Sequence, residues 1–158
     1  MSVSKSPRWR PALPEDARSL WLWRNDPASR RNSLTQGRIS LTAHRRWLAG
    51  KLADSRCALW IAEDPSGRAV GQARVDLSAS GVGLVSIAVA PRHRGEGWGT
   101  AMLRRLPMRV GRRRAKRLRA VIKAENLPSV VAFLKAGFRF RRVQPDGAYE
   151  LERGDGDE

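Results

Sequence analysis

The feature of this sequence that most constrains its fold is a glycine-rich turn between two apolar segments. Three glycines alternate from Gly95 to Gly99, after the nearly continuous apolar run 82–89 and before a segment that predicts a helix. Glycine tolerates positive φ and lets another group approach the backbone closely. Successive backbone N–H groups at such a helix start can point at one anion, so the turn predicts a phosphate site. A pyrophosphate suits it, because Arg92 and Arg94 add positive charge beside the turn.

Other glycine-rich turns fit this segment less well. A dinucleotide-binding turn has similar spacing, but it follows the first strand of a βαβ unit and has an acid about 20 residues further on. Here the turn comes late in the chain, after segments that predict antiparallel hairpins. A P-loop needs Gly-Lys-Ser/Thr, which the sequence lacks. On spacing alone, a strand-to-helix connection that binds no ligand stays open.

The rest of the pattern predicts one mixed α/β domain over 1–158, with disordered tails at about 1–7 and 154–158. The turn Asp64-Pro65-Ser66-Gly67 predicts a hairpin, and Thr42 is the expected cap of the second helix. Pro107 is expected to kink or split the third helix, and 28–41 to form a polar connection. Expected strands are 9–12, 58–63, 69–77, 82–89, 117–123, 138–143 and 148–151, and expected helices are 14–26, 42–53, 97–114 and 126–136.

The chain length of 158 residues suits one core, and 41% hydrophobic with 29% charged residues is ordinary for a soluble protein. No apolar run approaches the roughly 20 residues that a membrane helix needs. The first ten residues lack the apolar stretch of a signal peptide, so a cytoplasmic location is expected. Cys57 is the single cysteine and is interpreted as a buried structural thiol; no metal site is expected.

The net charge of +16 comes from 31 basic and 15 acidic residues, and it favours anionic partners. Only five of the basic residues are lysines, so the arginine bias can reflect genome composition. Nucleic acid is therefore not the expected partner, and the run 112–114 is interpreted as a solvated helix end. Arginine matches phosphate geometry well, which keeps a charged nucleotide ligand attractive.

Two segments resemble the signatures of the GNAT superfamily of N-acetyltransferases. The stretch 86–103 resembles the family's Arg/Gln-x-x-Gly-x-Gly/Ala motif at the end of its fourth strand, and 124–138 resembles its second signature. The resemblance extends from about residue 9 to 151. It implies a mixed, mostly antiparallel sheet with splayed central strands flanked by helices. It also implies that an amine attacks acetyl-coenzyme A (acetyl-CoA) directly, with no acyl-enzyme.

The resemblance also assigns the donor site. The backbone after Arg94 would hold the pyrophosphate, and the strand before it would bond the pantetheine arm as if it were another strand. One strand N–H would stabilise the oxyanion. Residues at the start of the last helix would contact the cofactor near its sulfur. The implied cofactor-binding set is Ile87, Ala88, Val89, Arg94, Gly95, Glu96, Gly97, Trp98, Gly99, Thr100, Asn126, Ser129 and Phe133.

The sequence departs from the family pattern at proton transfer. Many relatives have a Glu general base in the region that corresponds to 81–86, which contains no acid here. Phe133 stands where many relatives have a Tyr as general acid. Glu125 and His44 are therefore the candidate bases. Alignment of the two reactants alone can contribute roughly 7–11 kcal/mol, so catalysis can rest on proximity and a water chain.

The segment from Trp23 to Trp47 narrows the expected acceptor. It resembles a subset of the family that includes amino-sugar N-acetyltransferases of the pseudaminic acid pathway. This subset is similar in turn to the acetyltransferases of ribosomal-protein N-termini. A small-molecule amine, best a nucleotide-linked amino sugar, is the expected acceptor. A protein N-terminus is the enzymatic alternative, and a basic nucleic-acid-binding or ribosome-binding module the non-enzymatic one. A homodimer is left open. The predicted acceptor-site residues are Arg24, Asn25, His44 and Trp47.

Each of these acceptor-site residues also has an ordinary structural interpretation. Trp47 can be a core residue, and His44 can be a surface or capping residue on a helix. Arg24 and Asn25 can simply end the first helix. The sequence alone does not choose between these interpretations and the functional ones.

Overall fold

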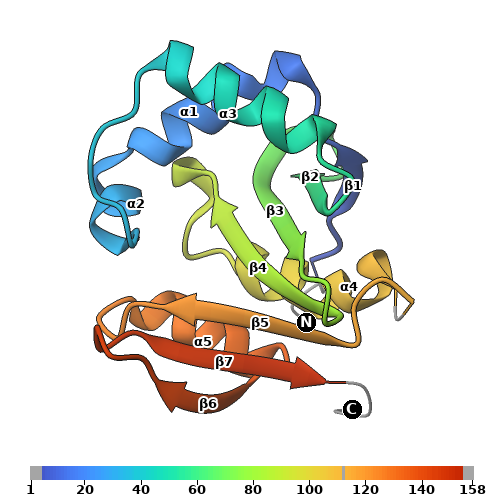
Figure 1. Ribbon diagram of the computed structural model, residues 1–158. Coiled ribbons are helices and arrows are strands. Elements are labelled where there is room, and N and C mark those ends of the chain that lie inside the picture. The colour runs from blue at the N-terminus through green and yellow to red at the C-terminus, as the bar shows by residue number, and fades with distance from the viewer. Residues whose placement is uncertain (1–4, 112, 155–158) are drawn as a thin grey trace.

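A computed structural model describes residues 5–111 and 113–154 of the chain. The residues form a seven-stranded sheet with helices on both faces (Figure 1). The strand order is β1-β2-β3-β4-β5-β7-β6, so the sheet is open and β6 lies at one edge. Every side chain of β6 is exposed. The strands are β1 (Arg8–Pro11), β2 (Cys57–Glu63), β3 (Ala69–Leu77), β4 (Val82–Val89), β5 (Arg117–Ile122), β6 (Arg139–Val143) and β7 (Tyr149–Gly154).

The helices divide between the two faces of the sheet. Helices α4 and α5 cover the face that holds the main core, and α1 and α3 cover part of the other face over a smaller apolar cluster. None of the described helices is long and apolar enough to span a bilayer. The helices are α1 (Ala17–Asn25), α2 (Pro27–Asn32), α3 (Leu41–Ala53), α4 (Trp98–Val110) and α5 (Leu127–Lys135), with short 3-10 turns η1 (Pro14–Asp16) and η2 (Pro91–His93).

The two central strands separate, as the expected fold requires. All neighbouring strands pair antiparallel except β4 and β5, which are parallel. These two pair only over Val82–Leu84 and Arg117–Arg119, and they diverge beyond that point (Figure 1). The predicted mixed, mostly antiparallel sheet with splayed central strands is therefore confirmed.

The main core forms because α4 presents one apolar stripe to the sheet. Trp98, Met102, Leu106 and Val110 recur at intervals of four residues and are all buried. This spacing keeps the side chains on one side of a helix with 3.6 residues per turn. They pack against inward-facing residues of β3 such as Val75. The stripe therefore holds α4, and the turn that precedes it, against the middle of the sheet.

Two expectations about the first helices are wrong. Residues 28–32, the first part of the expected polar connection 28–41, belong to α2, because Pro27 opens the helix and the Asp26 carboxylate accepts from Ala28 N and Ser29 N at 3.2 and 3.3 Å. Thr42 is not the cap of α3. Ser40 takes that position, and its hydroxyl accepts from Ala43 N at 3.1 Å.

The expectations for Pro107 and for the helix end are also corrected. Helix α4 continues through Pro107 and ends at Val110, four residues before the expected end, because Gly111 follows with φ of 81°. Pro107 falls in the last turn, so it neither splits the helix nor ends it. Arg114 lies in a following turn and donates to Ser55 O at 3.2 Å, so it is not a helix end. Arg112 lies outside the described residues.

The tails differ from the expected boundaries as well. Lys5 is ordered against the glycine turn, with its ammonium 4.6 Å from the ring centre of Trp98. Gly154 is the last residue of β7 and pairs with Arg117. The expectation of disorder at residues 1–4 and 155–158 lies outside the described residues.

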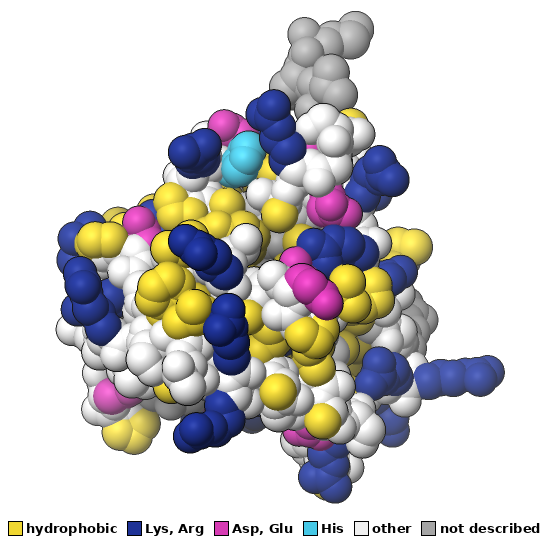
Figure 2. Space-filling view, turned by 90° about the horizontal axis from the view of Figure 1, so that it is seen from above, with side chains coloured by type: hydrophobic (Ala, Val, Ile, Leu, Met, Phe, Trp, Pro, Cys, Tyr) yellow, Lys and Arg dark blue, Asp and Glu magenta, His cyan; other side chains and the backbone are white. Residues whose placement is uncertain are grey.

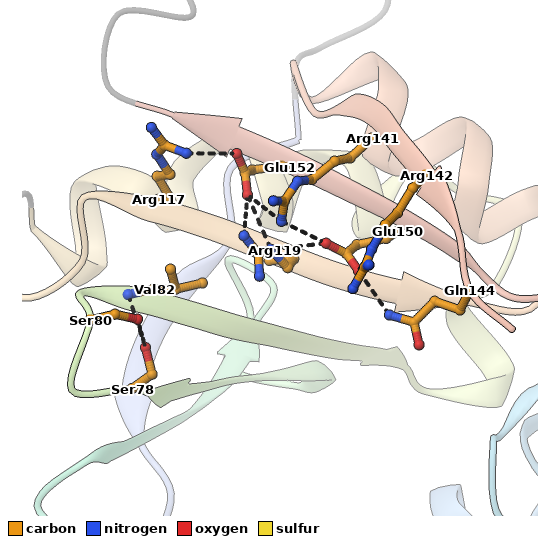
Figure 3. Close-up of polar contacts among 10 residues, drawn as sticks. All are labelled: Ser78, Ser80, Val82, Arg117, Arg119, Arg141, Arg142, Gln144, Glu150 and Glu152. Atoms are coloured by element: carbon orange, nitrogen blue, oxygen red, sulfur yellow. Dashed lines mark hydrogen bonds and ion pairs between the residues drawn. The ribbon is translucent and has the colours of Figure 1, made fainter.

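A cluster of charged residues stiffens the C-terminal hairpin (Figure 3). Glu150 is only 1% exposed, and its carboxylate accepts from Arg141 Nη1 at 2.8 Å, Arg142 Nε at 3.0 Å and Gln144 Nε2 at 2.8 Å. Arg119 lies 3.2 Å from Glu150 and also binds Glu152 at 2.7 Å. The cluster therefore ties β5, β6 and β7 together just before the β6–β7 turn.

Two glycines give opposite predictions for substitution by alanine. A Cβ at Gly71 would lie 2.5 Å from the carbonyl oxygen of Ala88, whereas one at Gly50 on α3 would meet nothing within 4 Å. Gly71→Ala is expected to lower the free energy of unfolding by about 1–3 kcal/mol through overpacking. Gly50→Ala is expected to raise it by about 1 kcal/mol. Urea unfolding measures both, and equal effects would contradict the packing at Gly71.

Glu150 predicts a pH dependence of stability. Burial alone would raise the pKa of this carboxyl, but hydrogen bonds from Arg142 and Gln144 and the charge of Arg119 outweigh burial and lower it. Because the folded pKa is lower than the unfolded value, the stabilisation is present above the ordinary Glu pKa of about 4.3. It is lost as pH falls through the folded pKa.

We expect Glu150→Gln to lower the free energy of unfolding by about 3 kcal/mol at pH 7, because it removes the charge that Arg119, Arg141 and Arg142 bind. The difference from wild type should shrink below pH 4. Urea unfolding at pH 7 and below pH 4 tests this, with the exposed Glu15→Gln as control. A difference that is independent of pH would show that Glu150 does not act through its charge.

Candidate active site

The separation of β4 and β5 exposes one edge of β4. From Val85 to Val89, β4 has no strand partner on its β5 side among the described residues. On its other side it stays paired with β3, with Ile87 opposite Ala73 and Val89 opposite Gly71. An extended ligand can bind such an edge by backbone hydrogen bonds, as an added strand does. The predicted cofactor residues Ile87, Ala88 and Val89 all lie in this stretch.

The glycine turn leads from this edge into α4. Gly95 and Gly97 have φ of 74° and 87°, values that other residues rarely adopt, and Gly97 is the N-cap of α4. The first helical hydrogen bond runs from Ala101 N to Gly97 O at 3.1 Å. The N–H groups of residues 98–100 therefore precede the helical ladder and can bind an anion at the positive end of the helix dipole.

Gly99 has a different role in the turn. A Cβ there would lie 3.6 Å from Val89 and 3.8 Å from Ile87, which is ordinary contact distance. Packing therefore does not require glycine here, and the distances show that α4 begins beside the unpaired part of β4. The turn and the strand edge thus form one continuous surface.

The charged residues of the turn have specific partners. Arg94, predicted to bind the pyrophosphate, donates to Asp26 Oδ2 at 2.8 Å and to Ser29 Oγ at 2.7 Å. Its guanidinium is thus directed toward the start of α2. Glu96 accepts from Trp98 Nε1 at 3.1 Å and lies 3.6 Å from His93 Nδ1.

The other end of α2 is attached to β5. Lys123 Nζ, just after β5, donates to Arg31 O at 3.0 Å. Helix α2 is therefore held on the β4 side by Arg94 and on the β5 side by Lys123, so it bridges the two diverging strands.

Helix α5 begins on the β5 side of this opening. Asn126 is its N-cap, and the side-chain oxygen accepts from Ser129 N at 3.4 Å. Phe133, which occupies the position of the family's usual Tyr, is 2% exposed and packs edge-to-face on Phe138 with ring centres 4.9 Å apart. The structure therefore places Phe133 in the core, and it offers no ionisable group.

An open pocket of about 700 Å³ lies at the β5 side of the opening. Its walls are the end of α2 with the connection to α3, the residues after β5, and the β6–β7 turn. Glu125, a candidate base, lies on this wall. Sequence reasoning missed Asp146, which lies in the β6–β7 turn and lines the pocket. The lining residues are Arg31, Asn32, Leu34, Gln36, Lys123, Ala124, Glu125, Asp146, Gly147 and Ala148.

Two predicted acceptor-site residues position the connection that lines this pocket. Asn25 binds the backbone of Ile39 through both atoms of its amide, with N···O distances of 2.8 and 3.0 Å. Arg24 Nη2 donates to the carbonyl of Thr35. The other terminal nitrogen of Arg24 is buried and has no hydrogen-bond partner among the described residues.

The other two predicted acceptor-site residues lie on the inner side of α3. His44 is only 5% exposed, so the surface interpretation is wrong. Burial and the charge of Arg24 lower the pKa of His44, which keeps its imidazole neutral at pH 7. Trp47 is 37% exposed, so the core interpretation is wrong too. Its ring lies 5.2 Å from that of His44 and 5.2 Å from the Arg74 guanidinium.

Sequence reasoning missed a polar row on β3 that faces α3. Gln72, Arg74 and Asp76 share this face, and their alternation within 69–77 was the available signal. Asp76 binds Lys51 at 2.8 Å and Arg74 at 2.9 Å. Burial and Asp76 raise the pKa of Cys57 to about 11, so this thiol is not a nucleophile at neutral pH.

Among residues 5–111 and 113–154, no group of three or more His, Cys, Asp or Glu side chains is arranged to hold a metal ion.

The sequence and the fold are both similar to those of acetyltransferases. Several solved structures share the fold over nearly their whole length. AAC(6')-Ib, an aminoglycoside acetyltransferase, in complex with ribostamycin and coenzyme A, has a TM-score of 0.84 at 20% identity, covering 96% of this chain and 95% of that one. A spermidine N-acetyltransferase from Vibrio cholerae, in complex with CoA and spermine, has a TM-score of 0.87 at 13% identity, covering 96% and 97%.

An acetyltransferase from Thermus thermophilus has a TM-score of 0.78 at 20% identity, covering 97% and 99%. No curated protein sequence matches the chain. At the sequence level, the family of acetyltransferase (GNAT) domains matches residues 8–139, which is most of the chain. The chain therefore belongs to the GNAT family of acetyltransferases.

Proposed function

We propose that this chain transfers an acetyl group from acetyl-CoA to a primary amine of a small molecule, and that the acceptor is a nucleotide-linked amino sugar. The observation that carries the proposal is the opening between β4 and β5, which has the glycine turn at one end and the mixed-charge pocket beside it. Structures of similar fold hold coenzyme A or acetyl-CoA together with amine-bearing molecules, which supports it.

The donor side follows from the backbone. The N–H groups after Gly97 bind the pyrophosphate, and the unpaired edge of β4 bonds the pantetheine arm. An N–H of Ile87 or Val89 donates to the thioester oxygen and stabilises the oxyanion. The neutral amine attacks the thioester carbon, and the new C–N bond forms as the C–S bond breaks. The nitrogen then loses a second proton, which the leaving thiolate takes up through water. Glu125 is the candidate to take the proton that the ammonium loses, because this acidic residue lines the pocket.

The pocket charges favour an acceptor with both an amine and an anionic group. Glu125 and Asp146 are carboxylates that can hold an ammonium, and Arg31 and Lys123 are cations that can bind phosphate oxygens. A nucleotide-linked amino sugar carries both groups. A peptide N-terminus carries the amine but needs no phosphate, which makes it the second candidate.

The non-enzymatic alternative explains less of the structure. A nucleic-acid-binding module needs a basic stripe that follows a phosphate backbone. In the face shown in Figure 2, basic side chains are dispersed among apolar and neutral ones rather than gathered in one stripe. A nucleic-acid-binding function also gives no explanation for the unpaired edge of β4.

Acetyl-CoA should stabilise the protein. At a concentration of about 100 times its Kd, a ligand adds about 2.7 kcal/mol, which corresponds to roughly 5–10 °C in Tm for a chain of this size. Thermal unfolding with and without the cosubstrate measures this. Thiol release should then be fastest with nucleotide-linked amino sugars among a panel that includes aminoglycosides, polyamines and peptides. If millimolar acetyl-CoA causes no thermal shift, the assignment of acetyl-CoA as the donor is contradicted. If only peptides are acetylated, the result favours a peptide N-terminus as the acceptor.

Gly97→Ala should weaken acetyl-CoA binding. The residue has φ of 87° and nothing within 4 Å of an added Cβ, so the effect is on backbone conformation and not on packing. The left-handed conformation costs about 1–2 kcal/mol for alanine. We expect the KM for acetyl-CoA to rise about tenfold or more. Gly37→Ala is the control, since its Cβ also meets nothing and its φ is ordinary. An unchanged KM in Gly97→Ala would refute the assignment of the turn.

A further inference from the structure

Helix α2 has no apolar core of its own. It is six residues long, and none of these described residues is buried. A helix this short is not stable alone in water, so contacts with the rest of the chain decide where it lies. Polar contacts at its two ends therefore hold α2 beside the diverging ends of β4 and β5 (Figure 1).

The start of α2 is tied to the glycine turn of the proposed donor site. Arg94 Nη1 donates to Asp26 Oδ2 at 2.8 Å, and Arg94 Nη2 donates to Ser29 Oγ at 2.7 Å. The same oxygen of Asp26 accepts from the backbone N–H groups of Ala28 and Ser29 at the start of the helix. One carboxylate therefore both caps α2 and attaches it to the turn.

The end of α2 belongs to the pocket proposed for the acceptor. Lys123, which also lines the pocket, donates to Arg31 O at 3.0 Å. Helix α2 and the connection after it supply four of the ten lining residues, namely Arg31, Asn32, Leu34 and Gln36. A shift of α2 would therefore move the wall against which the acceptor is proposed to bind.

Arg94 can bind a ligand of the turn and α2 at the same time. A guanidinium has five N–H donors in one plane, and the bonds to Asp26 and Ser29 use one on each terminal nitrogen. The Arg94 side chain is 36% exposed, so a phosphate oxygen can reach its other donors. A pyrophosphate at the turn then fixes the guanidinium from one side, while α2 stays bound on the other.

We propose that Asp26 is a positioning residue for the acetyl transfer, and that through Arg94 it couples bound acetyl-CoA to the acceptor wall formed by α2. The inference rests on the proposed function and deepens it, because it assigns a physical link between the donor and acceptor sites. Acetyl-CoA fixes Arg94, and Arg94 fixes the start of α2. The pocket wall is then in place before the acceptor binds.

Two variants weaken this link without removing the helix. Asp26→Asn keeps the cap, because Asn is as good an N-cap as Asp, but it loses the charge that pairs with Arg94. Ser29→Ala keeps the ion pair and introduces the residue of highest helix propensity, but it loses the hydroxyl that accepts from Arg94. The control is Asp64→Asn in the β2–β3 turn, where the carboxylate also accepts from two backbone N–H groups of its own turn.

Amide hydrogen exchange measures how firmly α2 is held. Exchange over residues 28–36 is followed by mass spectrometry, with and without acetyl-CoA, in wild type and in each variant. Strand β2, residues 57–63, is the internal reference. Because α2 has no buried side chain, its amides exchange by local opening and report the links at its ends.

We expect acetyl-CoA to slow exchange over 28–36 by about fivefold in wild type and in Asp64→Asn, an effect of the size of one partly exposed ion pair. In Asp26→Asn this segment should exchange faster without ligand, and acetyl-CoA should no longer slow it. Ser29→Ala should lie between the two, and exchange over 57–63 should stay constant. Equal slowing by acetyl-CoA in wild type and Asp26→Asn overturns the proposal.

A positioning role also affects the two substrates differently. With a UDP-linked amino sugar at saturating acetyl-CoA, Asp26→Asn should raise the KM for the sugar by about fivefold. The Kd for acetyl-CoA alone should stay the same or fall, because the carboxylate that partly neutralises Arg94 is gone. If Asp26→Asn instead binds both substrates more weakly, the site is generally damaged and the proposal is wrong.

The exchange experiment separates this proposal from the proposed function. If acetyl-CoA raises the Tm of wild type but leaves exchange over 28–36 unchanged, the coupling through Asp26 fails and the assignment of the donor stands. If acetyl-CoA slows that exchange in wild type but not in Asp26→Asn, and no amine is acetylated, the coupling stands and the proposed reaction fails. If acetyl-CoA does not raise the Tm of wild type, both fail.

Discussion

The structure depends on the early end of the pairing between β4 and β5. Backbone N–H and C=O groups need partners, and a central strand ordinarily finds them on both sides. Here three residue pairs hold the strands together, and the ladder then stops. The elements on both sides of this opening hold its walls in position. The apolar stripe of α4 fixes the glycine turn at one end, and the charged cluster around Glu150 stiffens the hairpin that forms the pocket wall.

The elements that sequence predicted well are those with strong local signals. The strands 69–77 and 82–89 have the expected bounds, because a turn with Asp, Pro and Gly precedes the first and an apolar run marks the second. Helix α2 was missed because its six residues include no large apolar side chain and so show no apolar period. Its stability comes from Asp26 and from the pairing of Asp26 with Arg94, 68 residues away, which no local pattern reveals.

The candidate site divides in the same way. The donor side follows from local motifs, because a glycine turn and the strand before it are continuous in sequence. The predicted acceptor-site residues lie on α1 and α3, and only the fold shows which of them are buried. His44 is followed directly by Arg45 and Arg46, which conceal its buried position in the sequence. Which buried polar atoms lack a hydrogen-bond partner can be seen only in the folded structure.

The exposed edge strand β6 has a consequence for assembly. An open sheet can grow by pairing its edge with the same edge of another copy. In β6 three of five residues are arginines, at positions 139, 141 and 142, alongside the exposed Phe140 and Val143. Antiparallel pairing of two such strands would set like charges opposite one another, which is destabilising. The edge can display its two apolar side chains to solvent because its own charge opposes the fibre-like stacking that they would otherwise invite.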